Sequence, residues 1–178
     1  LHEGLVGVTS EKLQEYKYAD LLKDVKEGQQ NTKTFDKLKG GWFGITDKYW
    51  ASALIPDPSA TTDALVTGYA KTPTSKESYQ VSYWTGGLTV APKESQTVLT
   101  RLFAGAKDVK VIEAYEKNPG ITKFNLMIDW GWFYFITVPM FHLIDWLASF
   151  FGKIGFKGNF GLAILATTVL VKAAFFYL

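Results

Sequence analysis

Cysteine is absent from the 178 residues, and histidine occurs only at His2 and His142. The chain therefore has no disulfide framework and no thiolate metal site, and two histidines give little material for a metal centre or a Ser-His-Asp triad. The many carboxylates are interleaved with lysines, which is typical of a solvated surface, and no pair stands out as an acid and a base. We expect neither an enzyme nor a bound metal or cofactor.

Charged residues are scarce in the last part of the chain. Residues 1–129 hold sixteen basic and sixteen acidic side chains, whereas residues 130–178 hold only Asp145, Lys153, Lys157 and Lys172. The net charge of +2 averages two unlike segments, and neither has the clustered basic surface that would bind nucleic acid. This pattern predicts a water-soluble domain followed by a membrane-associated segment.

Short strands with turn residues between them dominate the first segment. The run 41–55 is rich in aromatic and branched residues and ends at Pro56, and 65–71 and 97–103 also have strand-like composition. Residues 78–83 alternate polar with Tyr and Val, and Gly86-Gly87 separates them from a further strand-like run, 88–91. We expect a mainly β, sandwich-like domain.

Three other parts of this domain carry weaker or different patterns. Residues 10–25 fit a helical turn and an exposed strand equally well, and the polar, lysine-rich segment 28–40 is expected to be a surface loop. Residues 108–117 place Val109, Ile112 and Tyr115 at helical spacing before Asn118-Pro119-Gly120, which predicts a short amphipathic helix.

An aromatic helix is expected after residue 130. It can begin near Thr137 with Pro139 in its first turn, and His142, Asp145, Ser149 and Lys153 then share one face. From Pro139 to Phe151 such a helix is roughly 20 Å long, too short for a hydrocarbon core of about 30 Å. We expect it to lie along the membrane interface, while a buried core helix with one polar stripe is the alternative.

Residues 160–178 contain one charge, Lys172, in a run that is otherwise apolar or small. This composition favours a membrane-spanning helix, although the central helix of a large soluble protein fits the same pattern. A lysine inside such a helix is expected to face a polar cavity or partner; the alternative is a side chain that reaches the headgroups from near the helix end. The absence of Met at residue 1 and an apolar run that stops at Leu178 suggest a fragment.

The sequence resembles the bacterial YidC membrane protein insertases over nearly its whole length. The most specific stretch is Ile128-Asp129-Trp130-Gly131-Trp132-Phe133-Tyr134-Phe135, followed by Pro139-Met140-Phe141. Residues 160–164 and 168–172 continue the likeness, and Leu1-His2-Glu3-Gly4, Gly41-Trp42 and 103–107 look like the family's periplasmic domain.

This resemblance implies a fold and a division of the chain. Residues 1–125 would be the later portion of a periplasmic β-supersandwich of the galactose-mutarotase-like type, without its earlier strands. Residues 126–156 would be the interfacial helix region, and residues 157–178 the start of the insertase domain with its first core transmembrane helix. The residues expected at the membrane interface are Trp130, Trp132, Phe133, Phe135, Phe141, Trp146 and Phe150.

The resemblance also implies a function. The protein would insert and help fold membrane proteins in the bacterial inner membrane as a multi-pass protein, alone or beside the Sec translocon. Its partners would be nascent membrane proteins, Sec components, the lipid bilayer and, through regions outside this chain, the ribosome. Lys172 falls where the family places a basic residue in a hydrophilic groove that receives substrate.

Two other functions compete with this one. A membrane-tethered β-sandwich could bind carbohydrate or a partner protein, with Trp42, Trp50 and Trp84 as a stacking surface, although aromatic residues in strands are more often part of the core. An active mutarotase lacks the histidine and acid placement that such chemistry needs.

Overall fold

The structure consists of two compact units, residues 1–129 and residues 130–178. The computed structural model describes residues 3–10, 12–156 and 160–176. Strands are the main secondary structure of the first unit, and the second unit contains two long apolar helices.

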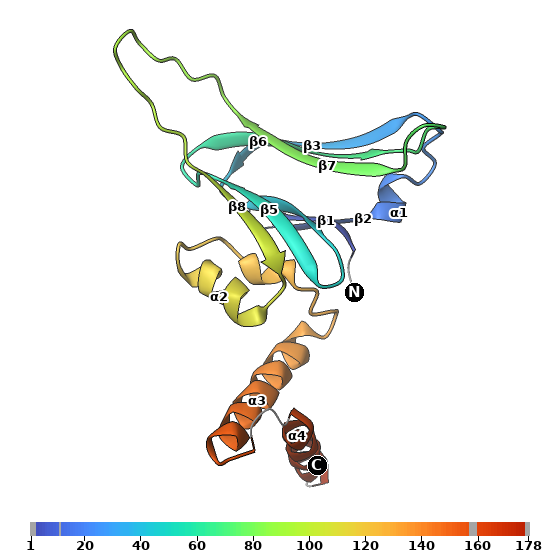
Figure 1. Ribbon diagram of the computed structural model, residues 1–178, viewed down its shortest axis with the longest axis vertical. Helices are drawn as coiled ribbons and strands as arrows, with labels where there is room; N and C mark the ends of the chain where they lie inside the picture. The colour runs from blue at the N-terminus through green and yellow to red at the C-terminus, as the bar shows by residue number, and fades with distance from the viewer. Residues whose placement is uncertain (1–2, 11, 157–159, 177–178) are drawn as a thin grey trace. The chain divides into compact units, whose positions relative to one another are not determined.

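Eight described strands of the first unit form two antiparallel sheets, which confirms the mainly β, sandwich-like architecture (Figure 1). One sheet has five strands in the order β2-β1-β4-β5-β8, and the other has three in the order β3-β6-β7. The strands are β1 (Gly4–Thr9), β2 (Lys12–Lys17), β3 (Gln30–Lys39), β4 (Trp42–Thr46), β5 (Trp50–Pro56), β6 (Thr61–Tyr69), β7 (Ser78–Thr85) and β8 (Thr100–Ala106).

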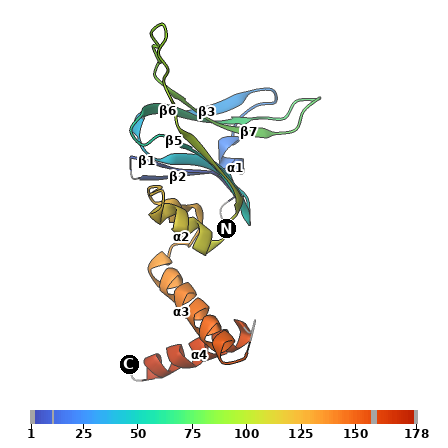
Figure 2. The ribbon, with the colours of Figure 1, turned by 60° about the vertical axis from the view of Figure 1, so that its left-hand side comes forward.

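The five-stranded sheet is covered on both faces. Leu5 and Phe43 pack toward the three-stranded sheet, where they meet Ala64 and Val66 of β6. On the other face, β1, β4 and β5 supply a second cluster that is covered by helix α2 (Val109–Lys117) and the 3-10 helix η1 (Phe124–Met127) (Figure 2). This double burial explains why all six residues of β1 are buried.

The short helix predicted over 108–117 is confirmed. The carboxylate of Asp108 caps α2 by accepting hydrogen bonds from the backbone N–H groups of Lys110 and Val111, at 2.8 and 3.2 Å. Ile112 is fully buried, and Phe124 of η1 packs edge-on against Trp42 at 5.3 Å between ring centres. The indole N–H of Trp42 donates to the Thr122 carbonyl, so the core tryptophan also holds the segment before η1.

The segment 28–40 was wrongly predicted to be a loop, because most of it is strand β3. β3 lies at the edge of the three-stranded sheet, so only a few of its side chains, including Phe35 and Leu38, need to face the core. Its lysines face water, which is how edge strands commonly avoid pairing with other chains. A bulge between Phe35 and Leu38, with Lys37 in a left-handed conformation, further obscures the alternation.

Other strand boundaries differ from expectation in ways that follow from pairing. Residues 12–17 are an exposed strand and Tyr18–Leu21 form the one-turn helix α1, so both interpretations of 10–25 were partly correct. The strand expected at 88–91 was wrong, since residues 86–99 form a long loop that extends away from the sheets (Figure 1). The strands near 65–71, 78–83 and 97–103 are confirmed, with shifted ends.

The second unit contains helices α3 (Tyr134–Lys153) and α4 (Phe160–Phe176). The start predicted near Thr137 was wrong: Thr137 already donates both its N–H and its hydroxyl to the Phe133 carbonyl. Pro139 therefore lies inside the helix. Because proline has no backbone N–H, the Phe135 carbonyl does not receive the hydrogen bond that residue 139 would otherwise donate.

Twenty residues give α3 a length of about 30 Å, so the length argument against a membrane-spanning helix was also wrong. Among the described residues, α3 is the one helix that is long and apolar enough to cross a membrane, and only 6% of its most apolar window is buried. Such exposure does not fit a core helix within this chain.

Candidate functional site

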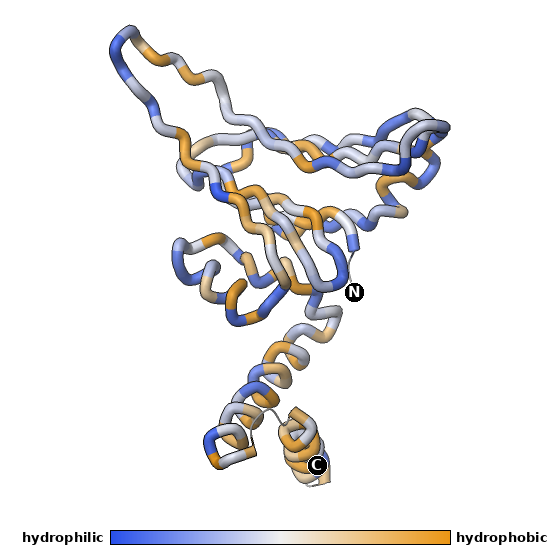
Figure 3. The backbone as a smooth tube through the Cα atoms, viewed as in Figure 1, coloured by the Kyte–Doolittle hydropathy of each residue, from blue (hydrophilic) through white to orange (hydrophobic). Residues whose placement is uncertain are grey.

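Helix α4 combines an apolar surface with a single charge. Its seventeen residues extend for about 26 Å, and nearly all of them are hydrophobic or small, as Figure 3 shows by colour. Large side chains stand exposed along it, with Leu165 at 64% and Val169 at 66% of their surface accessible. A helix that is apolar all round is stable only when other apolar material surrounds it.

Helices α3 and α4 pack against each other through small residues. The buried side chains of the pair are Leu147 on α3 and Ala163 and Thr167 on α4. Thr167 and Thr168 donate their hydroxyl hydrogens to the carbonyls four residues earlier, each at 2.8 Å. This pattern suits a membrane, where small residues allow close helix contact and every polar group needs an internal partner.

Lys172 lies on the side of α4 that faces away from α3. It follows Thr167 by five residues and Ala163 by nine, which corresponds to rotations of about 140° and 180° around the helix. Its side chain is exposed. The charge is therefore not used in the contact between the two helices and stays available on the opposite face.

The expected interface residues form small aromatic groups along α3 and the segment before it. Trp130 packs edge-on against Phe141 at 5.6 Å, and Trp146 stacks on Phe150 at 5.9 Å. Phe133 and Phe135 also contact each other, at 6.2 Å. Trp132 is 87% exposed, so the aromatic surface of this segment is largely uncovered within the chain.

The polar stripe on α3 has the composition expected from the sequence. His142, Ser149 and Lys153 are exposed and Asp145 is partly exposed. His142 and Asp145 lie near the middle of the helix, where charged and polar groups would be furthest from water in a spanning orientation.

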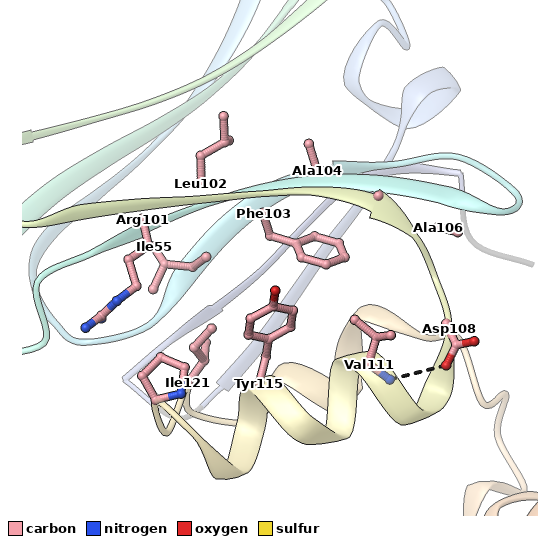
Figure 4. A pocket seen from close by; sticks show the side chains of 12 residues that line it. Ile55, Arg101, Leu102, Phe103, Ala104, Ala106, Asp108, Val111, Tyr115 and Ile121 are labelled. Atoms are coloured by element: carbon pink, nitrogen blue, oxygen red, sulfur yellow. Dashed lines mark hydrogen bonds between the residues drawn. The ribbon is translucent and has the colours of Figure 1, made fainter.

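The β domain contains an apolar cavity of about 470 Å³ between β8 and α2. Figure 4 shows Phe103 and Tyr115 pointing toward each other across it, while Leu102 and Ala104 point to the opposite side of the sheet. Asp108 lies at its edge, but this carboxylate already caps α2. The other charged residue of the lining is Arg101, whose guanidinium points away from Tyr115 and Asp108 in Figure 4, so these polar groups do not converge as those that orient a small ligand usually do.

A polar cluster at the end of this domain was not predicted from the sequence. The ammonium group of Lys107 donates to the Thr46 hydroxyl at 2.9 Å, and its backbone N–H donates to the Tyr49 carbonyl. Partial burial lowers the pKa of Lys107, while the nearby carboxylates of Asp129, Asp47 and Glu3 act in the opposite direction. Residues from four distant parts of the sequence form this cluster, so no local spacing could have indicated it.

Comparison with known proteins identifies the family. Residues 1–143 match the family described as the YidC periplasmic domain. Over 99% of its length the chain resembles proteins named membrane protein insertase YidC, with 49% identity in Brucella suis biovar 1, 49% in Mesorhizobium japonicum and 43% in Agrobacterium fabrum. The chain spans 27% of the length of each of these relatives. It belongs to the YidC family of bacterial membrane proteins.

Proposed function

We propose that this chain is part of an insertase that moves membrane proteins into the bacterial inner membrane and helps them fold. Membership of the YidC family supports this proposal, as do the names of the relatives. The observation that carries it in this chain is the single charge of α4, Lys172, on the face that α3 leaves open. A helix that served only as an anchor would gain nothing from a charge there.

Lys172 would act as an electrostatic attractor inside a bilayer-embedded groove. A lysine at the centre of a membrane helix costs about 2.5 to 3.5 kcal/mol on insertion scales. Lys172 is the thirteenth of the seventeen residues of α4, so its cost is lower, and a water-filled surrounding reduces it further. A positive charge in that position attracts acidic extramembrane segments of a substrate and shortens the apolar path that they must cross. No covalent chemistry is needed, and we propose none.

We propose that α3 lies along the membrane interface, although its length permits a spanning orientation. Asp145 would lie close to the bilayer centre if α3 crossed the membrane, where an aspartate costs about 2.5 to 3.5 kcal/mol. In the interface the stripe from His142 to Lys153 faces water, Trp146 lies beside this stripe at headgroup level, and Phe151 on the opposite side of the helix faces the acyl boundary. Helix α4 would then be the first core transmembrane helix of a multi-pass protein.

The partners follow from the same proposal. The chain would bind nascent membrane proteins and lipid, and the full-length protein would work alone or with Sec components, with the ribosome bound through regions outside this chain.

The carbohydrate-binding alternative finds less support. Trp42 is buried in the core, whereas Trp50 and Trp84 are exposed on strands of different sheets. The three tryptophans therefore do not form one stacking surface.

The decisive experiment replaces Lys172 in the full-length protein and measures insertion of several substrates with acidic extramembrane segments. Lys172→Glu should reduce insertion most, Lys172→Ala less, and Lys172→Arg should retain it because the charge is kept. Lys172→Leu separates the two interpretations of this lysine: if the side chain only reaches the headgroups, the Leu variant inserts every substrate normally. Normal insertion by Lys172→Glu with all substrates would refute the groove role.

A further inference from the structure

The turn between β4 and β5 exposes an unusual amount of aromatic surface. Tyr49 and Trp50 are adjacent and expose 66% and 63% of their surfaces. The ammonium group of Lys48 lies over the Tyr49 ring, 5.7 Å from its centre. Neither aromatic side chain belongs to the two core clusters of the domain. The hydrophobic core of this fold therefore does not depend on them.

This turn lies at the end of the domain from which the chain continues into the apolar unit. Lys48, Tyr49, Lys107 and Asp129 line one hollow of about 330 Å³. The hydrogen bond from the Lys107 backbone N–H to the Tyr49 carbonyl fixes the end of β8 beside the turn. Asp129 is followed directly by Trp130, so peptide continuity alone keeps the start of the aromatic segment close to this hollow.

We propose that Lys48, Tyr49 and Trp50 form an additional membrane contact of the β domain, in which the two aromatic rings enter the headgroup region of the bilayer. Tyr and Trp favour this region because one end of each ring system is apolar and the other can hydrogen-bond to water or headgroups. The inference rests on the membrane attachment contained in the proposed function. It adds a contact made by the soluble domain itself.

The charges around the turn indicate which property of the bilayer is recognised. Lys48 and Lys107 are accompanied by Asp47, Asp108 and Asp129, so the surface has no excess of positive charge. Attraction to anionic lipid therefore does not drive the contact. The aromatic rings provide the membrane contact, so it should form on vesicles of neutral lipid as well as on anionic vesicles.

The absence of cysteine makes a direct test simple. A single Lys48→Cys substitution, labelled with an environment-sensitive fluorophore, reports on the turn while retaining both aromatic rings. The control is Ser59→Cys, an exposed site in the turn that follows the other end of β5, about 20 Å away along the strand. Both labelled chains are reconstituted into phosphatidylcholine vesicles and into 3:1 phosphatidylethanolamine:phosphatidylglycerol vesicles, with and without brominated acyl chains.

The label at residue 48 should shift its emission to shorter wavelength on reconstitution and be quenched by brominated lipid in both vesicle types. The label at residue 59 should show neither change. Adding Tyr49→Ser and Trp50→Ser should abolish quenching at residue 48, whereas Trp84→Ser, which removes an exposed tryptophan from the other sheet, should leave it intact. Circular dichroism checks that each variant retains its strands.

Flotation of the same vesicles tests membrane attachment of the whole chain separately from lipid contact by the aromatic turn. Failure of the chain to float with lipid would overturn both membrane attachment and this contact. If the chain floats but the label at residue 48 stays in water, the aromatic turn does not touch lipid and only this inference is wrong. Quenching that occurs solely in anionic vesicles would also overturn it, because charge rather than the rings would then carry the contact.

Discussion

The two units of this chain place similar apolar side chains in opposite environments. In the β domain all six residues of β1 are buried, and Trp42 and Phe124 are almost completely enclosed. Of the described residues after 129, only Leu147, Ala163 and Thr167 are buried, while Trp132 and Phe176 expose 87% and 88% of their surfaces. The first unit therefore buries its own core, and the second requires an apolar solvent.

This difference has one physical cause. Transfer of apolar surface from water to an apolar environment is favourable. In the first unit that environment is the protein core, and in the second it is the bilayer. Polar groups show the same contrast: the β domain pairs its backbone through ladders between distant strands, whereas α4 satisfies even its threonine hydroxyls within one turn. If the two units are independent, a substitution in one of them should leave the stability or membrane binding of the other unchanged.

The largest expected effect is in the core of the β domain. Trp42→Ala removes a buried ring that packs on Phe124 and donates to the Thr122 carbonyl, so it should lower the free energy of unfolding by about 3 to 5 kcal/mol. Urea unfolding followed by near-ultraviolet circular dichroism measures this change. Trp84→Ala, at a tryptophan that is 44% exposed, should cost under about 1 kcal/mol.

Binding of either variant to vesicles should be unchanged. Release of the Trp42→Ala variant from lipid would show that the two units are not independent.

A smaller effect is expected at the contact between α3 and α4. Ala163 is completely buried, so Ala163→Leu should overpack this contact and destabilise the helix pair by about 1 to 3 kcal/mol. Unfolding of the chain in mixed micelles by added dodecyl sulfate measures the change through loss of helical signal. Ala173→Leu adds the same three carbons at an exposed position of α4 and should have little effect. Equal destabilisation by both substitutions would contradict packing through small residues.

The sequence predicted elements well where one short stretch carries the whole signal. Val109, Ile112 and Tyr115, followed by Asn118-Pro119-Gly120, sufficed for α2 because the helical spacing and the stop signal lie within one short stretch. β3 was missed because its core contacts depend on pairing with β6, thirty residues later, and its own residues are mostly polar. The start of α3 was misplaced because proline is common in the first turn of a helix, whereas Pro139 lies inside α3, where it removes one backbone hydrogen bond.

The candidate site shows the same division. Lys172 was identifiable because a single charge in an apolar run is visible without any structure. The orientation of Lys172 away from α3 could not be predicted, because it depends on which small residues of α4 pack against α3. The cluster of Lys107, Thr46 and Asp129 and the aromatic turn beside it needed the fold, because strand pairing brings these parts together.

The cap of α2 should contribute a moderate amount to the stability of the β domain. Asp108→Ala removes the acceptor for two backbone N–H groups and should cost about 1 kcal/mol in chemical unfolding. Asp108→Asn keeps a side-chain oxygen at the same place and should retain most of the stability. If Asn destabilises as much as Ala, the negative charge rather than the hydrogen bonds is what matters at this position.

The smallest effect is a pH dependence at Lys107. Burial lowers the pKa of this ammonium group in the folded state below its ordinary value of 10.5, so between the two pKa values the unfolded chain binds more protons. The free energy of unfolding contributed by Lys107 therefore rises as the pH increases through that window. Lys107→Met cannot titrate, so the free energy of unfolding of the original chain should rise relative to that of this variant as the pH approaches 10.5 from below. Tyr18 and Tyr79, whose raised pKa values act in the opposite direction, are present in both proteins and cancel in the difference. A difference that stays constant with pH would mean that the Lys107 ammonium group is as well solvated in the folded domain as in the unfolded chain.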